Sequence, residues 1–343
     1  MYRGTSNPPH EWRRRRTPIA KIRYLALLLS PLLLAFLAPS AQAQGYPNKP
    51  LKLVIPYAPG GALDYIGRVM AQYLGETIGQ TVVAENRPGA GGISGTDSVA
   101  RSAPDGYTIV IMDPAIVINP TLQPSVPYDL FKQIEAVSFI SSSPEVVVVA
   151  PQLPVKTMAE LVAYGKANPG KMNFGSAGIG TTPHLAAELF LQRTGVTATH
   201  VPYKTIGQSF PDMMAGKIHF SFSSIAGALA FTKDNRVRAI ATTGLKRSPV
   251  YPDLPTVDEA LLKGYEIDLW LGIFAPAGLP ADVRTKLNAS LNQALTKPEL
   301  IAAFEKVGAV PRGTDPAQSA ALLKSEFDKW KKIIVDGNIK AEN

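Results

Sequence analysis

Residues 51–64, LKLVIPYAPGGALD, constrain the fold most, because a short apolar strand runs through a Pro-Gly-Gly turn straight into an amphipathic helix. Apolar side chains alternate at Leu51, Leu53 and Ile55, as they do in a strand. From Leu63 they recur at helical spacing as far as Tyr73. The period changes at the turn, which predicts a strand and a helix joined by only a few residues.

The turn Pro59-Gly60-Gly61 also offers a place for a ligand. Glycine lets the backbone approach a ligand closely. The first turn of a helix has N–H groups without intrahelical partners, so an anion is the natural guest. The alternative is that the two glycines only make a tight connection between strand and helix.

The formal net charge of +8 is concentrated at the N-terminus. Residues 1–43 hold seven Lys and Arg and one acidic residue, which leaves 28 basic and 26 acidic residues in the rest of the chain. That remainder has no basic stripe with interleaved aromatic residues that could neutralise phosphates. The sequence therefore argues against nucleic acid as a partner.

Residues 1–43 have the three parts of an export signal, namely a basic region, an apolar run from Tyr24 to about Ala38, and the small-residue site Ala41-Gln42-Ala43. Because the apolar run is shorter than the roughly 20 residues of a spanning helix, we expect cleavage after Ala43 rather than a retained anchor. Cysteine is absent. The exported protein would therefore have neither disulfides nor thiolate metal ligands.

The rest of the chain alternates strand and helix patterns. Strand-like segments are residues 81–85, 107–112, 137–140, 146–150, 172–174, 200–203, 218–222, 238–243 and 269–275. Helical patterns include residues 157–167 and 183–194 and the region from residue 279 to the C-terminus. This alternation predicts an α/β fold with mostly parallel sheets, and the length is enough for two domains.

A second small, hydroxyl-rich loop lies at residues 175–182, GSAGIGTT, and leads into a helix. Thr182 suits the N-cap and Pro183 the first helical position. His184 would lie in the first turn, where the helix dipole disfavours its protonated form. Both glycine loops are expected at the carboxyl ends of strands, where α/β sheets bind ligands.

Motifs for catalysis or cofactors are not evident. The loop from Gly89 would need a glycine where Ser94 stands to match a dinucleotide fingerprint, and there is no G-x-S-x-G, P-loop or H-E-x-x-H motif. We therefore expect no cofactor and no metal. Ser176 and His184 remain an alternative as a catalytic pair of a secreted α/β hydrolase, although sharing a ligand fits their spacing better.

Seven segments together resemble the Bug (TctC-type) solute receptors of tripartite tricarboxylate transporters. They are YPNKPLKLVIPYAPGGALD, ENRPGAGGISG, ARSAPDGYTIVI, FGSAGIGTTPHLAAELF, VPYK, YPDLPTVDEA and WLGIFAPAGLP, spread over almost the whole exported chain. The resemblance implies a two-domain periplasmic binding protein fold, type II-like, with two crossover strands near residues 146–150 and 269–275. Domain 1 would be residues 44–146 with 270–343, and domain 2 residues 147–269.

The resemblance also implies a function: a monomeric, non-enzymatic periplasmic receptor. It would capture a small carboxylate, an aliphatic di- or tricarboxylate or an aromatic one, in a cleft between the domains. An inner-membrane permease would then receive the ligand. The ligand contacts carried over are Tyr57, Pro59, Gly60 and Gly61 from domain 1, and Ser176, Ala177, Gly178, Thr181, Thr182, His184 and Tyr203 from domain 2. Asp64 belongs to the same motif and contacts either the ligand or only the loop backbone.

The chain departs from the family pattern at two positions. It has Ser223 where members often carry an aspartate, and Thr205 where they often carry a glycine. An acid at residue 223 could face a ligand ammonium group. Its absence favours a plain carboxylate over an amino acid.

Overall fold

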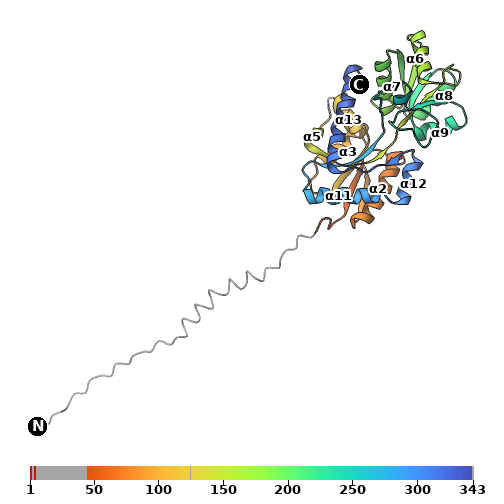
Figure 1. Ribbon diagram of the computed structural model, residues 1–343. Helices are drawn as coiled ribbons and strands as arrows, with labels where there is room; N and C mark the ends of the chain where they lie inside the picture. The colour runs from red at the N-terminus through yellow and green to blue at the C-terminus, as the bar shows by residue number, and fades with distance from the viewer. Residues whose placement is uncertain (2–3, 5–44, 124, 342–343) are drawn as a thin grey trace. The chain divides into compact units, whose positions relative to one another are not determined.

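The computed structural model describes residues 1, 4, 45–123 and 125–341, so the expected signal peptide lies outside the described residues. The chain from Tyr46 onward forms one compact unit (Figure 1). Within the described part, none of the helices has the length and apolar character that crossing a membrane requires.

The first sheet has the strand order β11-β4-β10-β3-β1-β2. Its strands are β1 (Leu51–Ile55), β2 (Val82–Asn86), β3 (Thr108–Met112), β4 (Ile134–Ser142), β10 (Leu271–Pro276) and β11 (Val310–Pro311). β1 is parallel to β2 and β3, whereas β10 is antiparallel to β3 and β4, and β11 is antiparallel to β4. We call this sheet with its helices lobe 1.

The second sheet has the order β7-β6-β8-β5-β9. Its strands are β5 (Glu145–Val149), β6 (Met172–Ser176), β7 (Ala198–Pro202), β8 (Phe220–Ser224) and β9 (Arg238–Thr242). β6 is parallel to β7 and β8, and β5 is antiparallel to β8 and β9. This sheet with its helices is lobe 2.

The α/β prediction is confirmed, but the expectation of mostly parallel sheets is wrong, because both sheets are mixed. The reason lies in the connections. A chain that leaves one sheet for another and later returns runs in opposite directions on the two passages. β4 leads out of the first sheet and β10 leads back in, so they pair antiparallel.

Helices cover both faces of the first sheet. α2 (Ala62–Ile78), α11 (Ala281–Ala294) and α12 (Pro298–Lys306) share a core with Leu53, Ile55 and Ile111. α3 (Ile93–Ala100), α4 (Ala115–Leu122) and α13 (Pro316–Asp336) pack on the other face, which presents Val54 and Val110. The short helices η1 (Ala90–Gly92) and α5 (Leu130–Gln133) precede α3 and β4. Because successive side chains of a strand point to opposite faces of the sheet, alternate residues of each strand belong to two separate cores.

In lobe 2, α7 (Thr182–Thr194) packs against β6 and β8, and α9 (Ile225–Lys233) packs against β5 and β8. The other helices are α6 (Met158–Ala167), η2 (Ile206–Gln208), α8 (Ser209–Met214) and α10 (Val257–Ala260). The N-cap of α7 is Thr181 rather than the predicted Thr182, and it makes no side-chain capping bond. Its hydroxyl instead donates to the carbonyl of Gly178.

The chain passes between the sheets at two adjacent segments. The first is Ser143-Pro144, between β4 and β5, and the second is the segment from Asp268 to Trp270, just before β10. Pro144 and Asp268 form an antiparallel bridge, and Leu269 N–H donates to Ser143 O at 2.9 Å. The segments expected as crossovers lie just beyond these passages, in β5 and β10.

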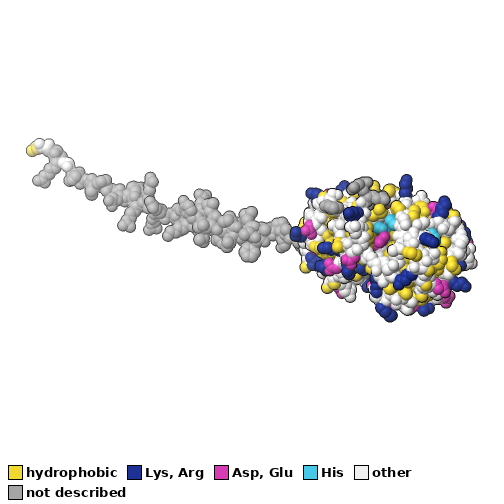
Figure 2. Space-filling model, turned by 90° about the horizontal axis from the view of Figure 1, so that it is seen from above, with side chains coloured by type: hydrophobic (Ala, Val, Ile, Leu, Met, Phe, Trp, Pro, Cys, Tyr) yellow, Lys and Arg dark blue, Asp and Glu magenta, His cyan; other side chains and the backbone are white. Residues whose placement is uncertain are grey.

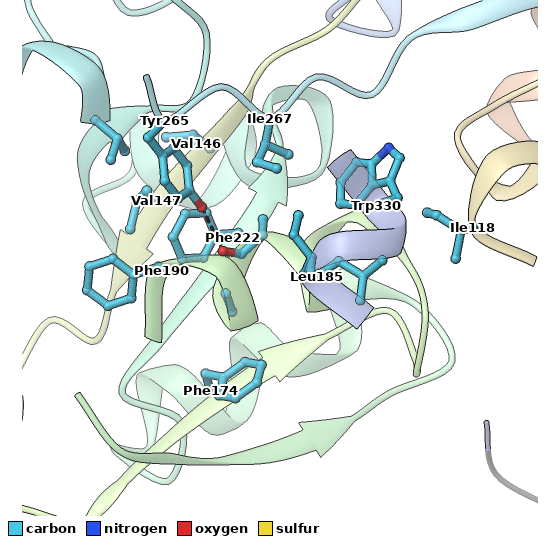
Figure 3. Close-up of a cluster of buried hydrophobic side chains, with 14 of the residues drawn as sticks. Ile118, Val146, Val147, Phe174, Leu185, Phe190, Phe222, Tyr265, Ile267 and Trp330 are labelled. Carbon is cyan, nitrogen blue, oxygen red and sulfur yellow. Dashed lines mark hydrogen bonds between the residues drawn. The ribbon is translucent and has the colours of Figure 1, made fainter. Parts of the chain in front are cut away.

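One hydrophobic cluster continues across both lobes. Ile118 of α4, Leu185 of α7 and Trp330 of α13 belong to it and are drawn in Figure 3. Gln192 of α7 also donates to Ile333 O of α13 at 3.0 Å. Helices from the two lobes therefore pack directly against each other.

Charged side chains are distributed evenly over the visible surface. On the face shown in Figure 2, Lys and Arg are scattered among acidic and neutral groups rather than gathered in a stripe. This agrees with the near balance of charge after residue 43.

Candidate functional site

The loop between β1 and α2 is held by the carboxylate of Asp64. Its Oδ2 accepts from Gly60 N–H at 2.9 Å, and its Oδ1 accepts from Asn86 Nδ2 at 2.8 Å. Arg68 lies 3.1 Å away. Burial raises the pKa of Asp64, but these hydrogen bonds and Arg68 outweigh it and bring the pKa below its usual value. The Asp64 side chain thus holds the backbone of this loop in place.

The backbone of this loop faces outward. Pro59, Gly60 and Gly61 are exposed, and Gly60 has a φ of +94°, which favours glycine. α2 begins at Ala62, and its N-cap Gly61 has no side chain to cap the first N–H groups. The N-terminus of a 17-residue helix therefore presents its donors at the carboxyl end of β1.

Tyr57, at the start of the same loop, makes an internal contact that the sequence did not reveal. Its hydroxyl donates to both carboxylate oxygens of Asp113 at 3.1 Å, and Ala115 N–H donates to Asp113 Oδ1 at 2.9 Å. Burial, opposed by these donors, raises the pKa of Asp113. The pair joins the carboxyl ends of the neighbouring strands β1 and β3.

The loop after β6 in lobe 2 is tied together from inside. Ser176 Oγ lies 2.6 Å from His200 Nε2 and accepts from Gly178 N–H at 3.0 Å. Thr181 Oγ1 donates to Gly178 O at 2.7 Å. Ser176 is fully buried, whereas Ala177, Gly178 and Thr181 are partly exposed. Backbone and hydroxyl groups of the loop, rather than Ser176, face solvent.

Two stacked imidazoles support this loop. His184 Nδ1 accepts from Gly180 N–H at 3.1 Å, and the rings of His184 and His200 lie 4.0 Å apart. Burial and the neighbouring His184 lower the pKa of His200 to about 3. His200 is therefore neutral near pH 7. The fold brings His200 on β7 to Ser176 and turns His184 to Gly180, so the Ser176–His184 pair of the alternative hydrolase is not formed.

The other expected lobe 2 residues lie around this loop. Thr182 is buried in the first turn of α7. Tyr203 N–H donates to Ser176 O at 3.1 Å, so the end of β7 is fastened to the loop. The Tyr203 hydroxyl donates to Asp212 at 2.8 Å, and burial together with Asp212 raises its pKa to about 12.

The lobe 2 loop touches lobe 1. A Cβ added to Gly180 would lie 2.2 Å from Leu122 Cδ2, at the end of α4. α4 begins directly after Asp113, the partner of Tyr57. The two glycine loops are therefore linked through α4, and both lie at carboxyl ends of parallel strands, where α/β sheets bind ligands.

What this arrangement can do is bind. It offers helix N-termini, backbone N–H groups and neutral hydroxyls, and among the described residues no three His, Cys, Asp or Glu side chains are placed to hold a metal ion. His200 and Asp113 were missed, because each acts through a partner distant in sequence. For Asp113 the only signal was its position directly after a strand, whereas His200 lies in the middle of β7 and gave no such signal.

Comparisons with known proteins agree with this geometry. The family model described as tripartite tricarboxylate transporter family receptor, TctC, matches residues 66–339. The chain is 32% identical over 314 residues to the protein BugT of Bordetella pertussis, covering 91% of this chain and 96% of BugT.

Two solved structures from Rhodopseudomonas palustris are similar and carry ligands. Rpa4515 with adipate has 31% identity and a TM-score of 0.73, over 87% of this chain and all of that one. MatC with bound malate has 28% identity and a TM-score of 0.66, over 84% of this chain and all of that one.

Proposed function

Because the chain belongs to the receptor family of tripartite tricarboxylate transporters, we propose that it is a periplasmic solute-binding receptor for a small carboxylate. It captures the ligand between its lobes and delivers it to an inner-membrane permease. The observation that carries the proposal is that one glycine loop from each lobe adjoins α4. Gly180 lies against Leu122 of α4, and Tyr57 donates to Asp113, the residue before the N-cap of α4. Adipate and malate in two similar structures support a dicarboxylate as the ligand.

Recognition in this proposal relies on neutral donors. In lobe 1 the exposed Gly60 and Gly61 precede the N-terminus of α2, and in lobe 2 Ala177, Gly178 and Thr181 precede that of α7. Helix N-termini stabilise an anion without a buried cation. Ser223 is buried and donates to Ser224 O, so a neutral group stands where an acid could have met an ammonium ion. These features favour a plain carboxylate.

Within this proposal the lobes correspond to the expected domains, residues 44–146 with 270–343 and residues 147–269, with the first boundary moved to Pro144. The two passages between the sheets then act as the hinge. Ligand binding and lobe closure would be coupled in a monomer.

A hydrolase using Ser176 is the weaker proposal. The Ser176 hydroxyl is buried, and among the described residues no carboxylate lies within hydrogen-bond distance of His200 to orient it as in a triad. The receptor predicts saturable binding without turnover.

The experiment is a thermal-shift screen of mono-, di- and tricarboxylates, adipate and malate among them, followed by calorimetry on each hit. A ligand at a hundredfold excess over its dissociation constant stabilises the folded state by about 2.7 kcal/mol. A carboxylate that raises the melting temperature and is recovered unchanged supports the receptor. Stabilisation by sugars or amines alone would refute it.

A further inference from the structure

Glu145 is the most anomalous buried group among the described residues. It is 0% exposed, and neither carboxyl oxygen has a hydrogen-bond partner in the described part of the chain. It begins β5, one residue after the passage at Ser143-Pro144, and it pairs with Ser224 of β8. An isolated charge in such a place is costly, so a carboxyl group there keeps its proton.

Asp268 stands on the other passage and is well supplied with donors. Ser142 Oγ donates to its Oδ2 at 2.5 Å and Ser143 N–H to its Oδ1 at 2.5 Å. Its carboxylate therefore ties the two passages together. Burial raises its pKa to about 6.

The charges around the pair are few. Asp268 is the charged group that acts on Glu145, and burial with this neighbour raises the pKa of Glu145 to about 8. Glu326 of α13 raises the pKa of Asp268, and Lys329 of α13 lowers it. Burial and the nearby Glu145 raise the pKa of Tyr265, and Arg193 at the end of α7 lowers it. None of these groups donates a hydrogen bond to Glu145. The hydrogen-bond donors in this low-dielectric region therefore stabilise a charge on Asp268 but not on Glu145.

We propose that Glu145 and Asp268 form a one-proton lock on the connection between the lobes, in which Asp268 carries the charge and Glu145 the proton. Loss of the Glu145 proton adds a second negative charge to this buried connection, where Pro144, next to Glu145, is bridged to Asp268, and loosens the contact between the lobes. The lock operates without ligand, so its test is independent of the proposed receptor function.

The direction of the pH dependence follows from the raised pKa. Between about 4.5 and about 8 the folded state holds a proton on Glu145 that the unfolded state has released. The stabilisation is complete below the unfolded pKa and is lost as the pH rises toward the folded pKa. Asp268 is half ionised at about pH 6 and mostly ionised a pH unit higher, so the loss toward pH 8 belongs mainly to Glu145.

Two variants test the lock, Glu145→Gln and Glu145→Met. Both remove the titrating proton, and Met also removes the buried polar atoms, so at least one is expected to fold. From pH 6.5 to pH 7.5 the unfolding equilibrium constant of the wild type should rise up to tenfold more than that of either variant. Parallel pH profiles in urea unfolding would overturn the proposal.

The contact between the lobes can be followed by separate measurements. Trp270 and Trp330, the tryptophans after residue 12, both donate to Glu326 Oε2, at 2.8 and 3.0 Å, beside the hinge. Between pH 6.5 and pH 9 we expect a shift of tryptophan emission and a larger radius of gyration in the wild type, and neither change in the variants. An infrared difference spectrum at pH 7 should assign a protonated carboxyl band to Glu145. Absence of that band, or identical emission and scattering in all three proteins, contradicts the lock.

Discussion

The hydroxyl of Ser176 and Nε2 of His200 lie 2.6 Å apart, although 24 residues separate them in sequence. Ser176 ends β6 and His200 lies in the middle of the neighbouring parallel strand β7, and Phe174 stacks on the His200 ring at 4.8 Å. His200 is thereby fixed beneath the lobe 2 loop. It is a positioning residue for Ser176 and, through Ser176, for the backbone of Gly178.

Variants of His200 distinguish its hydrogen bond to Ser176 from the packing of its ring. His200→Phe keeps a planar ring but leaves the buried Ser176 without its strongest partner, so we expect a loss of about 1 kcal/mol of unfolding free energy. His200→Gln can still place a polar nitrogen or oxygen near Ser176 and should lose less. Urea unfolding measures both, and equal stability of the Phe variant and the wild type would remove the positioning role.

His200 also makes the stability of the folded protein depend on pH in the acid range. Because the pKa of His200 is lowered to about 3 in the folded protein, the unfolded state takes up a proton first as the pH falls below about 6.5. Stability from the neutral imidazole is complete above that value and is lost toward pH 3. The wild type should therefore lose stability relative to His200→Gln between pH 6.5 and pH 4, and coincident profiles of melting temperature would count against a buried neutral His200.

An Asp64 variant tests whether this side chain holds the lobe 1 loop. Asp64→Ala removes the buried, charged acceptor of Gly60 N–H and Asn86, and losing hydrogen bonds to a charged group costs about 1.5 to 3 kcal/mol. Asp97→Ala is the matched control, because Asp97 also forms an i,i+4 pair with an arginine, Arg101, but on the surface. Its loss should be about 0.5 kcal/mol or less. If both variants lose the same amount, Asp64 does not hold the loop.

Local pattern predicted the parts of the fold that depend on local order. The change of period at residues 59–61 is contained in the sequence, and β1 and α2 begin where it predicts. α4 was not predicted, because Pro120 lies inside it and its residues are apolar on every side, which hides helical spacing. Strand direction depends on how the chain crosses between sheets, so the antiparallel placement of β5 and β10 could not be predicted from strand patterns.

The candidate site divides in the same way. Glycine loops and helix starts are local features, and they identified both loops. Hydrogen-bond partners are tertiary features, so the sequence offered only His184, eight residues away, as an alternative partner of Ser176, whereas the fold pairs Ser176 with His200. For Asp64 two roles were open; the hydrogen bond from Gly60 N–H shows its contact with the loop backbone, and a contact with the ligand stays a prediction.

Thr181 combines loop geometry with the proposed ligand contact. Its hydroxyl donates to Gly178 O, so Thr181→Val should distort the loop and weaken carboxylate binding by about 1 to 3 kcal/mol. Thr181→Ser keeps the hydroxyl and should retain most of the affinity. Calorimetry with the best carboxylate from the thermal-shift screen is the measurement. Affinity that is unchanged in the Val variant would exclude both roles.

Gly180 tests whether the contact between the lobes is needed for binding. Its φ is +76° and an added Cβ would lie 2.2 Å from Leu122, so Gly180→Ala adds an overlap across the lobes to the cost of a left-handed alanine. Gly170→Ala is the control, since Gly170 has a φ of +72° with nothing within 4 Å of the added Cβ. Both variants lose about 1 to 2 kcal/mol of stability from the backbone alone.

Only Gly180→Ala should also lose ligand affinity. The overlap with Leu122 adds about 1 to 3 kcal/mol if the lobes stay together, and the lobes can avoid that cost by separating. We therefore expect weaker carboxylate binding and a larger radius of gyration for Gly180→Ala, with both quantities unchanged for Gly170→Ala. If the two variants bind the carboxylate equally well and scatter alike, the meeting of the lobe 2 loop with α4 is not part of the binding state, and the two-loop arrangement of the proposed receptor has to be abandoned.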